Sequence, residues 1–151
     1  MASNRDARLF AFSSRFIHTS RAWRQLADTA LAPLRLSYST TQPLLFVHRL
    51  GGAPRQTALA AAVGIEGPSL VRLLDQLSAA GLLTRGDDPT DRRAKIIQLT
   101  PSGAALVAQA EAALTAERAR VMADVDDKDL ETAIRVLDAV AAGIERQDVA
   151  A

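Results

Sequence analysis

The sequence predicts a mainly α-helical fold with one small β-hairpin. Apolar residues recur at spacings of three and four over most of the chain, which is the spacing of one face of a helix. Two short runs of strand-forming residues flank a polar turn near residue 89, which is typical of a hairpin. With 151 residues the chain can bury one ordinary core but hardly two, so we expect a single domain over residues 1–151.

The N-terminal segment predicts one long helix that ends at Pro33. A second helix is expected to begin between Ser39 and Gln42, where a Ser-x-x-Gln pattern can cap it, and to end at Gly51-Gly52. Pro43 then falls in or near the first turn, where proline is tolerated. The apolar stripe of the first helix consists of Leu9, Phe12, Phe16, Thr19, Trp23, Leu26 and Ala30.

Residues 55–80 fit a helix-turn-helix, two helices that meet at a short turn. Leu59 and Val63 can face inward, and Gly64 permits the turn. Pro68 begins the second helix. A generic helical hairpin would satisfy part of this pattern. The buried face of the second helix is expected at Leu70, Leu73, Leu74 and Leu77.

Two short strands are expected next, over residues 82–85 and 95–99, and the polar tip between them contains Gly86 and Pro89. A helix-turn-helix followed by such a hairpin makes a winged helix. We therefore place a winged helix-turn-helix at residues 36–100.

The C-terminal third predicts two more helices, one from Thr100-Pro101 to about Val125 and one capped by Asp126. Apolar residues of the last helix repeat at spacings of four and three, as in a coiled-coil-like contact. Packing onto the chain's own core is the alternative, although a stripe at each end is more than one small domain easily buries. We therefore expect residues 1–35 and 101–151 to be dimerisation helices. The predicted interface residues are Leu9, Phe12, Phe16, Leu130, Ile134, Leu137 and Ile144.

Composition excludes several classes of protein. Without cysteine the chain can form no disulfide and no thiolate metal site. His18 and His48 fit no metal-ligand spacing, so we predict no metal and no cofactor. No apolar run approaches the roughly 20 residues of a membrane span, so we expect a cytoplasmic protein without a membrane partner.

The net charge of +1 is unevenly distributed. Residues 1–35 hold six basic and two acidic side chains, residues 36–100 hold seven and five, and residues 101–151 hold five and ten. A basic front and an acidic tail are expected if only one part of the protein meets phosphate.

The second helix of the helix-turn-helix carries a polar face opposite its leucines, at Ser69, Arg72, Gln76 and Ala79. Arginine can donate two hydrogen bonds to guanine O6 and N7, and glutamine suits adenine. Ser69 lies near the helix N-terminus, where free N–H groups can meet a phosphate. Phosphate would repel Asp75, so we place Asp75 at the edge of the face that meets DNA. For Arg72 alone, a solvated helix face is the alternative.

The hairpin tip carries two adjacent arginines, Arg92 and Arg93. Long cationic side chains at an exposed turn can enter a narrow A·T-rich minor groove. Asp91 can hold a guanidinium through a bidentate pair. These elements predict contacts to double-stranded DNA from Pro68, Ser69, Arg72, Gln76, Asp91, Arg92 and Arg93.

The motifs of residues 64–99 resemble the MarR family of transcription regulators, and within it the SlyA branch. The wing motif is the specific part, and Trp23-Arg24 and Leu31-Ala32-Pro33-Leu34 extend the similarity more weakly. The motifs are Pro68-Ser69-Leu70-Val71-Arg72, Leu74-Asp75-Gln76-Leu77, Gly81-Leu82, Asp91-Arg92-Arg93-Ala94-Lys95 and Leu99-Thr100.

The resemblance implies a homodimer with interdigitated terminal helices that binds a pseudo-palindromic operator. It implies that Arg72 reads the major groove and Arg93 the minor groove, while Asp91 and Arg92 support the wing. It further implies release by a small phenolic or aromatic acid, held in a crevice between the dimer helices and the winged helix. The candidate ligand residues are Arg21, Trp23 and Arg24.

Two other classes of function are weighed against this interpretation. A winged-helix protein-interaction module would present the same core, but it has no need of Arg92 and Arg93 at an exposed turn. An enzyme is not supported, because the sequence offers no nucleophile with a base, no Gly-rich phosphate loop and no carboxylate cluster. We therefore expect a sequence-specific DNA-binding transcription regulator.

Overall fold

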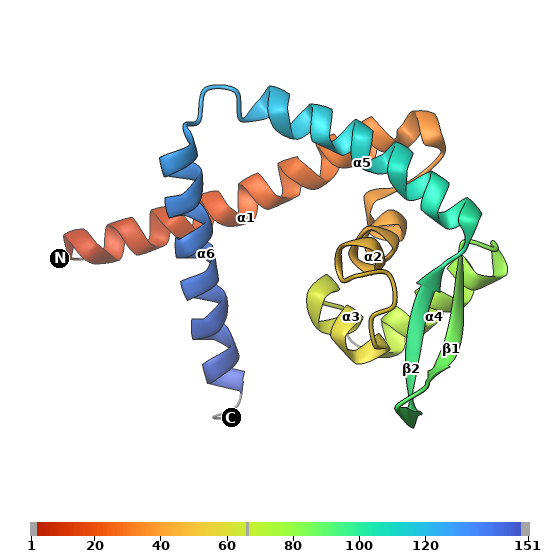
Figure 1. Ribbon diagram of the computed structural model, residues 1–151. Helices are drawn as coiled ribbons and strands as arrows, with labels where there is room; N and C mark the ends of the chain where they lie inside the picture. Colours follow the sequence, from red (N-terminus) through yellow and green to blue (C-terminus); the bar gives the residue numbers. More distant parts are fainter. Residues whose placement is uncertain (1–2, 66, 149–151) are drawn as a thin grey trace. The chain divides into compact units, whose positions relative to one another are not determined.

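The computed structural model describes residues 3–65 and 67–148 (Figure 1). Residues 1–2 and 149–151 of the predicted terminal segments, and residue 66 of the helix-turn-helix, lie outside the described residues. The chain divides into two compact units, Met1–Glu117 and Arg118–Ala151, and each is described by itself. The predicted fold class, mainly helical with one hairpin wing, is confirmed. The elements are α1 (Asn4–Leu31), a 3-10 turn η1 (Ala32–Leu34), α2 (Tyr38–Arg49), α3 (Gln56–Val63), α4 (Gly67–Ala79), β1 (Leu83–Asp88), β2 (Asp91–Leu99), α5 (Pro101–Val121) and α6 (Asp127–Asp148).

Helix α1 begins at a capping box, in which the Ser3 hydroxyl accepts from the Asp6 N–H and the Asp6 carboxylate accepts from the Ser3 N–H. Only its last turns enter the core, where Ala27 and Leu31 are fully buried. The first half of the predicted apolar stripe is exposed, and the rings of Phe12 and Phe16 lie stacked with their centroids 6.3 Å apart.

Helix α2 begins earlier than the sequence pattern predicts. Ser37, and not Ser39, is the N-cap, because its hydroxyl accepts from the Thr40 N–H at 3.3 Å. Pro43 therefore lies inside the helix and beyond the first turn, where it is buried against the core. Pro43 is thus near the first turn, as predicted, but not within it. Gly51 and Gly52, both with φ of 88°, end the helix as predicted.

Helices α3 and α4 form the predicted helix-turn-helix. Gly64 ends α3 in the left-handed conformation, with φ of 70°, which glycine adopts without steric cost. Leu59 of α3 and Leu70 and Leu74 of α4 are fully buried in one core with residues of α1, α2, β1, β2 and α5. Burying each leucine stabilises the fold by about 1.5–3 kcal/mol.

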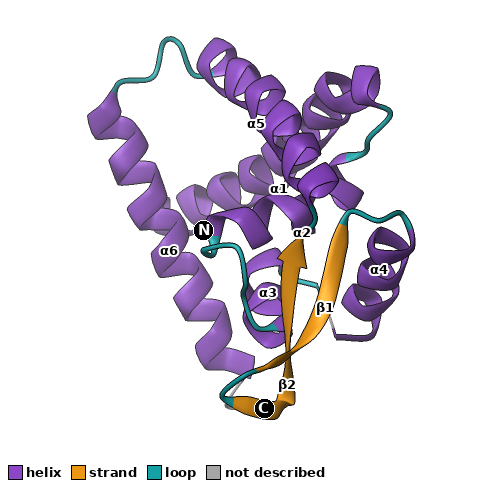
Figure 2. Ribbon diagram, turned by 45° about the vertical axis from the view of Figure 1, so that its right-hand side comes forward, coloured by secondary structure: helices purple, strands orange, loops and turns teal. Residues whose placement is uncertain are grey.

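The hairpin is longer than predicted, and Figure 2 shows its two strands running antiparallel beside α4. Leu83 pairs with Leu99 at one end and Asp88 with Asp91 at the other, with an irregularity between Asp87 and Asp88. The turn is therefore Pro89-Thr90, and Arg92 and Arg93 lie on β2 instead of in the turn. A further bridge joins Arg55, just before α3, to Ile96 of β2.

Helix α5 begins with the predicted Thr100-Pro101 pair, and the Thr100 hydroxyl accepts from the Gly103 N–H at 3.0 Å. It ends at Val121, one turn before the predicted Val125. In the second unit, the Asp126 carboxylate accepts from the Asp129 N–H at 2.8 Å and caps α6, as predicted. Ile134, Leu137 and Ile144 on the predicted stripe of α6 are exposed.

Within the described residues, no single helix is long and apolar enough to cross a membrane. Helices α3 and α4 reach that length and apolar content only when they are taken together, and they are bent by 107° relative to each other.

Candidate nucleic-acid interface

Helix α4 presents a polar face to solvent and an apolar face to the core. Leu70, Leu74 and Leu77 are buried, and Leu73 is half-buried. This alternation follows the 3.6-residue period of the helix. The residues predicted to contact DNA, Pro68, Ser69, Arg72 and Gln76, are all exposed.

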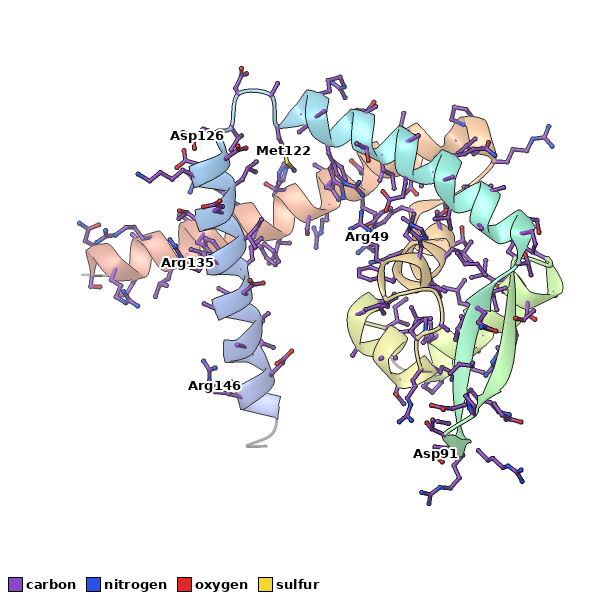
Figure 3. All side chains as sticks on the ribbon, in the orientation of Figure 1. Arg49, Asp91, Met122, Asp126, Arg135 and Arg146 are labelled. Carbon is purple, nitrogen blue, oxygen red and sulfur yellow. The ribbon has the colours of Figure 1, made fainter. Side chains whose placement is uncertain are left out.

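The distal end of the hairpin carries the two predicted wing arginines on β2. Arg92 is exposed, and the side chain of Arg93 is 94% exposed. Asp91, labelled at the end of the hairpin in Figure 3, accepts from the Arg93 backbone N–H at 3.0 Å and lies 3.5 Å from the Arg93 Nε. The bidentate pair predicted for Asp91 is not formed with Arg93, because the ion pair between the two side chains is long, at 3.5 Å from Oδ1 to Nε. This leaves the Arg93 guanidinium mostly in solvent.

A second acidic group, which the sequence patterns did not indicate, organises the turn. Asp88 is 6% exposed, and its carboxylate accepts from the hydroxyl and backbone N–H of Thr90, at 2.6 and 2.8 Å. The Arg55 Nε donates to the other carboxylate oxygen at 2.7 Å. The hydrogen bonds from Thr90, aided by Arg55 and opposed by burial, lower the pKa of Asp88 from 3.8 to about 2.

Arg85 connects the hairpin to both helices of the helix-turn-helix. Its Nη1 donates to Oδ1 of Asp75 on α4 at 2.5 Å, and its Nη2 donates to Oε1 of Gln56 on α3 at 2.8 Å. Asp75, which we placed at the edge of the DNA-facing side, is thus engaged by the wing. Further toward the tip, Lys95 of β2 pairs with Asp87 of β1.

A small cleft of about 170 Å³ lies where the start of α3 approaches β2. It brings Arg93 together with residues that the sequence separates by about forty positions. The residues that line it are Arg55, Gln56, Thr57, Arg93, Ala94 and Lys95.

A larger cleft of about 440 Å³ lies along α1. Two of the three predicted ligand residues, Arg21 and Arg24, line it. Trp23 is half-buried and is not part of the lining, since it lies about 200° around the helix from Arg21. The predicted role of Trp23 in an effector crevice between the dimer helices and the winged helix stays a prediction. The lining residues are Ser20, Arg21, Arg24, Gln25 and Asp28.

Known proteins share this architecture. A model of the MarR family matches residues 36–94, which include α2, α3, α4 and most of the wing. The crystal structure of transcriptional regulator PA3341 is 39% identical, with a TM-score of 0.81, and the match covers 89% of this chain and 98% of that one. The chain belongs to the MarR family. As a MarR-family protein it is a DNA-binding transcription regulator and not an enzyme.

Two structures with lower sequence identity share the fold. A mutant of MarR from E. coli, crystallised with operator DNA, is 22% identical, with a TM-score of 0.72, and the match covers 84% of this chain and 91% of that one. The regulator BldR from Sulfolobus solfataricus is 22% identical, with a TM-score of 0.78, over 93% of this chain and 99% of that one. Their likeness concerns the fold alone.

Proposed function

We propose that this MarR-family regulator binds a specific double-stranded DNA site with both grooves read by residues 36–100. The observation that carries the proposal is the joint exposure of the polar face of α4 and of the two arginines at the distal end of the wing. A helix such as α4 fits the major groove, and an arginine on a narrow hairpin fits the minor groove.

The role of each residue follows from its position. Arg72 and Gln76 are assigned to base edges, and Ser69 to the phosphate near the start of α4. Pro68, which has no N–H, is assigned to van der Waals contact with the DNA beside Ser69. In the wing, Arg93 is assigned to the minor groove. Asp91 and Arg92 support it, through the backbone contact of Asp91 to Arg93 and through the exposed charge of Arg92. The wing motif Asp91-Arg92-Arg93-Ala94-Lys95 also supports placement in the SlyA branch.

The protein acts, in this proposal, as a homodimer whose terminal segments, 1–35 and 101–151, form the interface. On α1, Leu9 is 53% exposed and Phe16 is 47% exposed. On α6, Ile134 is 58% exposed and Ile144 is 59% exposed. Apolar side chains at coiled-coil spacing are suited to bury against a second copy of the same chain. A two-fold dimer would bind a pseudo-palindromic site.

A small phenolic or aromatic acid is the proposed effector, and the cleft along α1 is its proposed site. Arg21 and Arg24 supply guanidinium groups that suit a carboxylate. Asp28 on the same cleft is engaged elsewhere, since it accepts from the Tyr38 N–H at 2.7 Å. Through that hydrogen bond the cleft is connected to the start of α2. A ligand that binds one dimer geometry better than another would shift DNA affinity by that difference alone.

Footprinting of the purified protein on genomic DNA at two salt concentrations tests the proposal. We expect protected sites with two related half-sites, and affinity that falls as salt rises, because lysine and arginine contacts to phosphate release counterions. Binding that ignored sequence would contradict the specific site. Affinity that ignored salt would favour the protein-interaction module instead.

A further inference from the structure

Among the side chains whose hydrogen bonds are described above, only that of Arg85 joins the wing to both helices of the helix-turn-helix. Its two terminal nitrogens donate to different residues, Asp75 of α4 and Gln56 of α3, at 2.5 and 2.8 Å. The side chain is 27% exposed while the residue as a whole is exposed, so the guanidinium lies at the surface of the joint between the hairpin and the helices. One guanidinium therefore contacts three elements.

The strand register explains why Arg85 points toward the helices. Arg85 pairs with Ile97 of β2, and residues that pair directly across two antiparallel strands project from the same face. Ile97 is fully buried, and its N–H donates to the carbonyl oxygen of Pro54 at 3.0 Å. The face that carries Arg85 is therefore the inner face of the hairpin.

Arginine is the residue type that this position requires. Its guanidinium is planar and holds its donors in a fixed fork, so two contacts define both the distance and the direction between the elements. A lysine ammonium is a compact point charge that would keep the attraction to Asp75 but would not fix that direction.

The contact with Asp75 contributes little to the stability of the fold, because the Asp75 side chain is 62% exposed and exposed ion pairs are weak. Its effect is geometrical. Asp75 lies three residues after Arg72, so the two are neighbours on the surface of α4. The hydrogen bond from Arg85 to Asp75 therefore lies next to the proposed major-groove contact of Arg72.

We propose that Arg85 is a positioning residue that holds the wing at a fixed angle to α4 and so couples the two DNA-reading elements. This inference rests on the proposed roles of Arg72 and Arg93. Without the fork, Arg55 and the buried Ile97 still attach the wing, but its angle to α4 is less tightly fixed, and Arg93 enters the minor groove less well when α4 is seated in the major groove.

A double-mutant cycle on operator affinity tests the coupling. Arg85→Leu, Arg93→Ala and the double variant are titrated onto the same operator as the wild type. If Arg85 acts by placing Arg93, the second substitution costs little once the first is present, and the product of the two single losses exceeds the double loss severalfold. Losses that multiply to within about twofold, as for independent sites, overturn the proposal and indicate that Arg85 contacts DNA itself or only supports the fold.

Two further variants make the cycle specific. Arg49→Leu removes an ion pair between α2 and α5, where Arg49 Nη2 lies 2.8 Å from Glu111 Oε1, and its cycle with Arg93→Ala should be additive. Arg85→Lys keeps the charge and should show an intermediate coupling. A coupling as large in the Arg49 cycle as in the Arg85 cycle would contradict the proposal, because it would reflect a general loss of stability.

A measurement without DNA separates this inference from the proposed function. The chain has no cysteine, so Ser78→Cys on α4 and Arg92→Cys on β2 can carry a pair of spin labels. With labelled protein diluted into an excess of unlabelled protein, the distance distribution should be broader in Arg85→Leu than in the wild type and unchanged in Arg49→Leu. An unchanged distribution in Arg85→Leu would overturn the inference even if the protein bound its operator as proposed. Failure of the wild type to bind any specific site would overturn the proposed function and leave the distance result standing.

Discussion

The Arg55 Nε donates to Asp88 Oδ2 at 2.7 Å and so ties the residue before α3 to the last residue of β1. Arg55 also bridges Ile96 through its backbone, and its Nη2 donates to the Thr90 hydroxyl at 3.3 Å. The turn of the wing is thereby connected to the start of the helix-turn-helix. Arg85 makes a second connection nearer the base of the hairpin. Two arginines from opposite sides of this joint therefore fix the wing against the helices.

The Asp88 contact predicts an acid-sensitive wing. The pKa of Asp88 is lowered from 3.8 to about 2, so its ionised form stabilises the fold fully above about pH 4, and this contribution is lost as the pH falls toward about 2. Thermal unfolding measured across that range should fall less steeply for Asp88→Asn than for the wild type. Asp138→Asn, which removes an exposed carboxylate on α6, serves as the control and should follow the wild type. Parallel curves for Asp88→Asn and the wild type would contradict the assignment.

Replacing Gly103 by alanine should change the stability of the protein in the opposite direction to the same replacement at Gly143, another helical glycine. A Cβ on Gly103 would overlap the backbone carbonyl oxygen of Leu82, because α5 passes directly against the start of the hairpin. Gly103→Ala should therefore destabilise the protein by about 1–3 kcal/mol, as overpacking does. Gly143→Ala on α6 meets only the end of the Arg146 side chain, at 3.7 Å, and should stabilise the helix by about 0.5–1 kcal/mol. Chemical denaturation measures both changes, and equal signs would contradict this reading of the two sites.

The helices and the turn of the winged helix were predictable because their signals are local. The leucine spacing of α4 and the glycine at residue 64 act within one or two turns of the chain, and both expectations are confirmed. The cap of α2 was assigned to the wrong serine. Ser37 and Ser39 both precede a helical stretch with suitable residues after them, and only the geometry of the chain as it leaves η1 decides between them.

The joint between wing and helices was not predictable from local pattern. Arg55 and Asp88 are 33 positions apart, and Arg85 and Gln56 are 29 apart, so no spacing rule connects them. The Asp88-Pro89-Thr90 sequence is a turn signal that could have placed the turn. The extent of β1 and β2 depends on pairing across that turn, so the two arginines predicted to lie in the turn are found on β2.

The exposed stripes predict that one charge in the interface breaks the dimer. Ile134→Glu should dissociate the protein, because each copy loses about 1.5–3 kcal/mol of apolar burial and a two-fold interface repeats the loss. Ala139→Glu adds the same charge about 140° around α6 and should leave the dimer intact. Sedimentation at micromolar concentration measures the two states. A wild-type protein that sediments as a folded monomer would remove the basis of this prediction.

The cleft along α1 predicts how an acid effector is held. Arg21→Ala or Arg24→Ala should weaken binding of a salicylate-like acid by about 1.5–3 kcal/mol, the usual contribution of a hydrogen bond to a charged group. Arg15→Ala, an exposed arginine outside the lining, is the control. Calorimetric titration measures the affinity, and operator binding with and without the acid measures release. If the acids bound all four proteins equally, the site would lie elsewhere.

Truncating Arg72 on α4 and Arg93 on the wing should weaken DNA binding in different ways. Arg72→Ala should weaken binding to the cognate operator by about 1–3 kcal/mol and relax specificity at one base position, as expected when a bidentate guanine contact is removed. Arg93→Ala should weaken binding by an amount that follows the A·T content and width of the minor groove, and not the identity of a single base.

Both variants should remain folded, because the Arg72 and Arg93 side chains lie outside the core. The measurement is the affinity of each variant for a panel of substituted operators at two salt concentrations. If Arg72→Ala weakened binding equally for every operator in the panel and reduced the salt dependence of the affinity, the Arg72 side chain would be reassigned to a phosphate contact. If neither substitution weakened binding to any operator, residues 36–100 would not read DNA in the proposed way, and the protein-interaction module would become the better description of this winged helix.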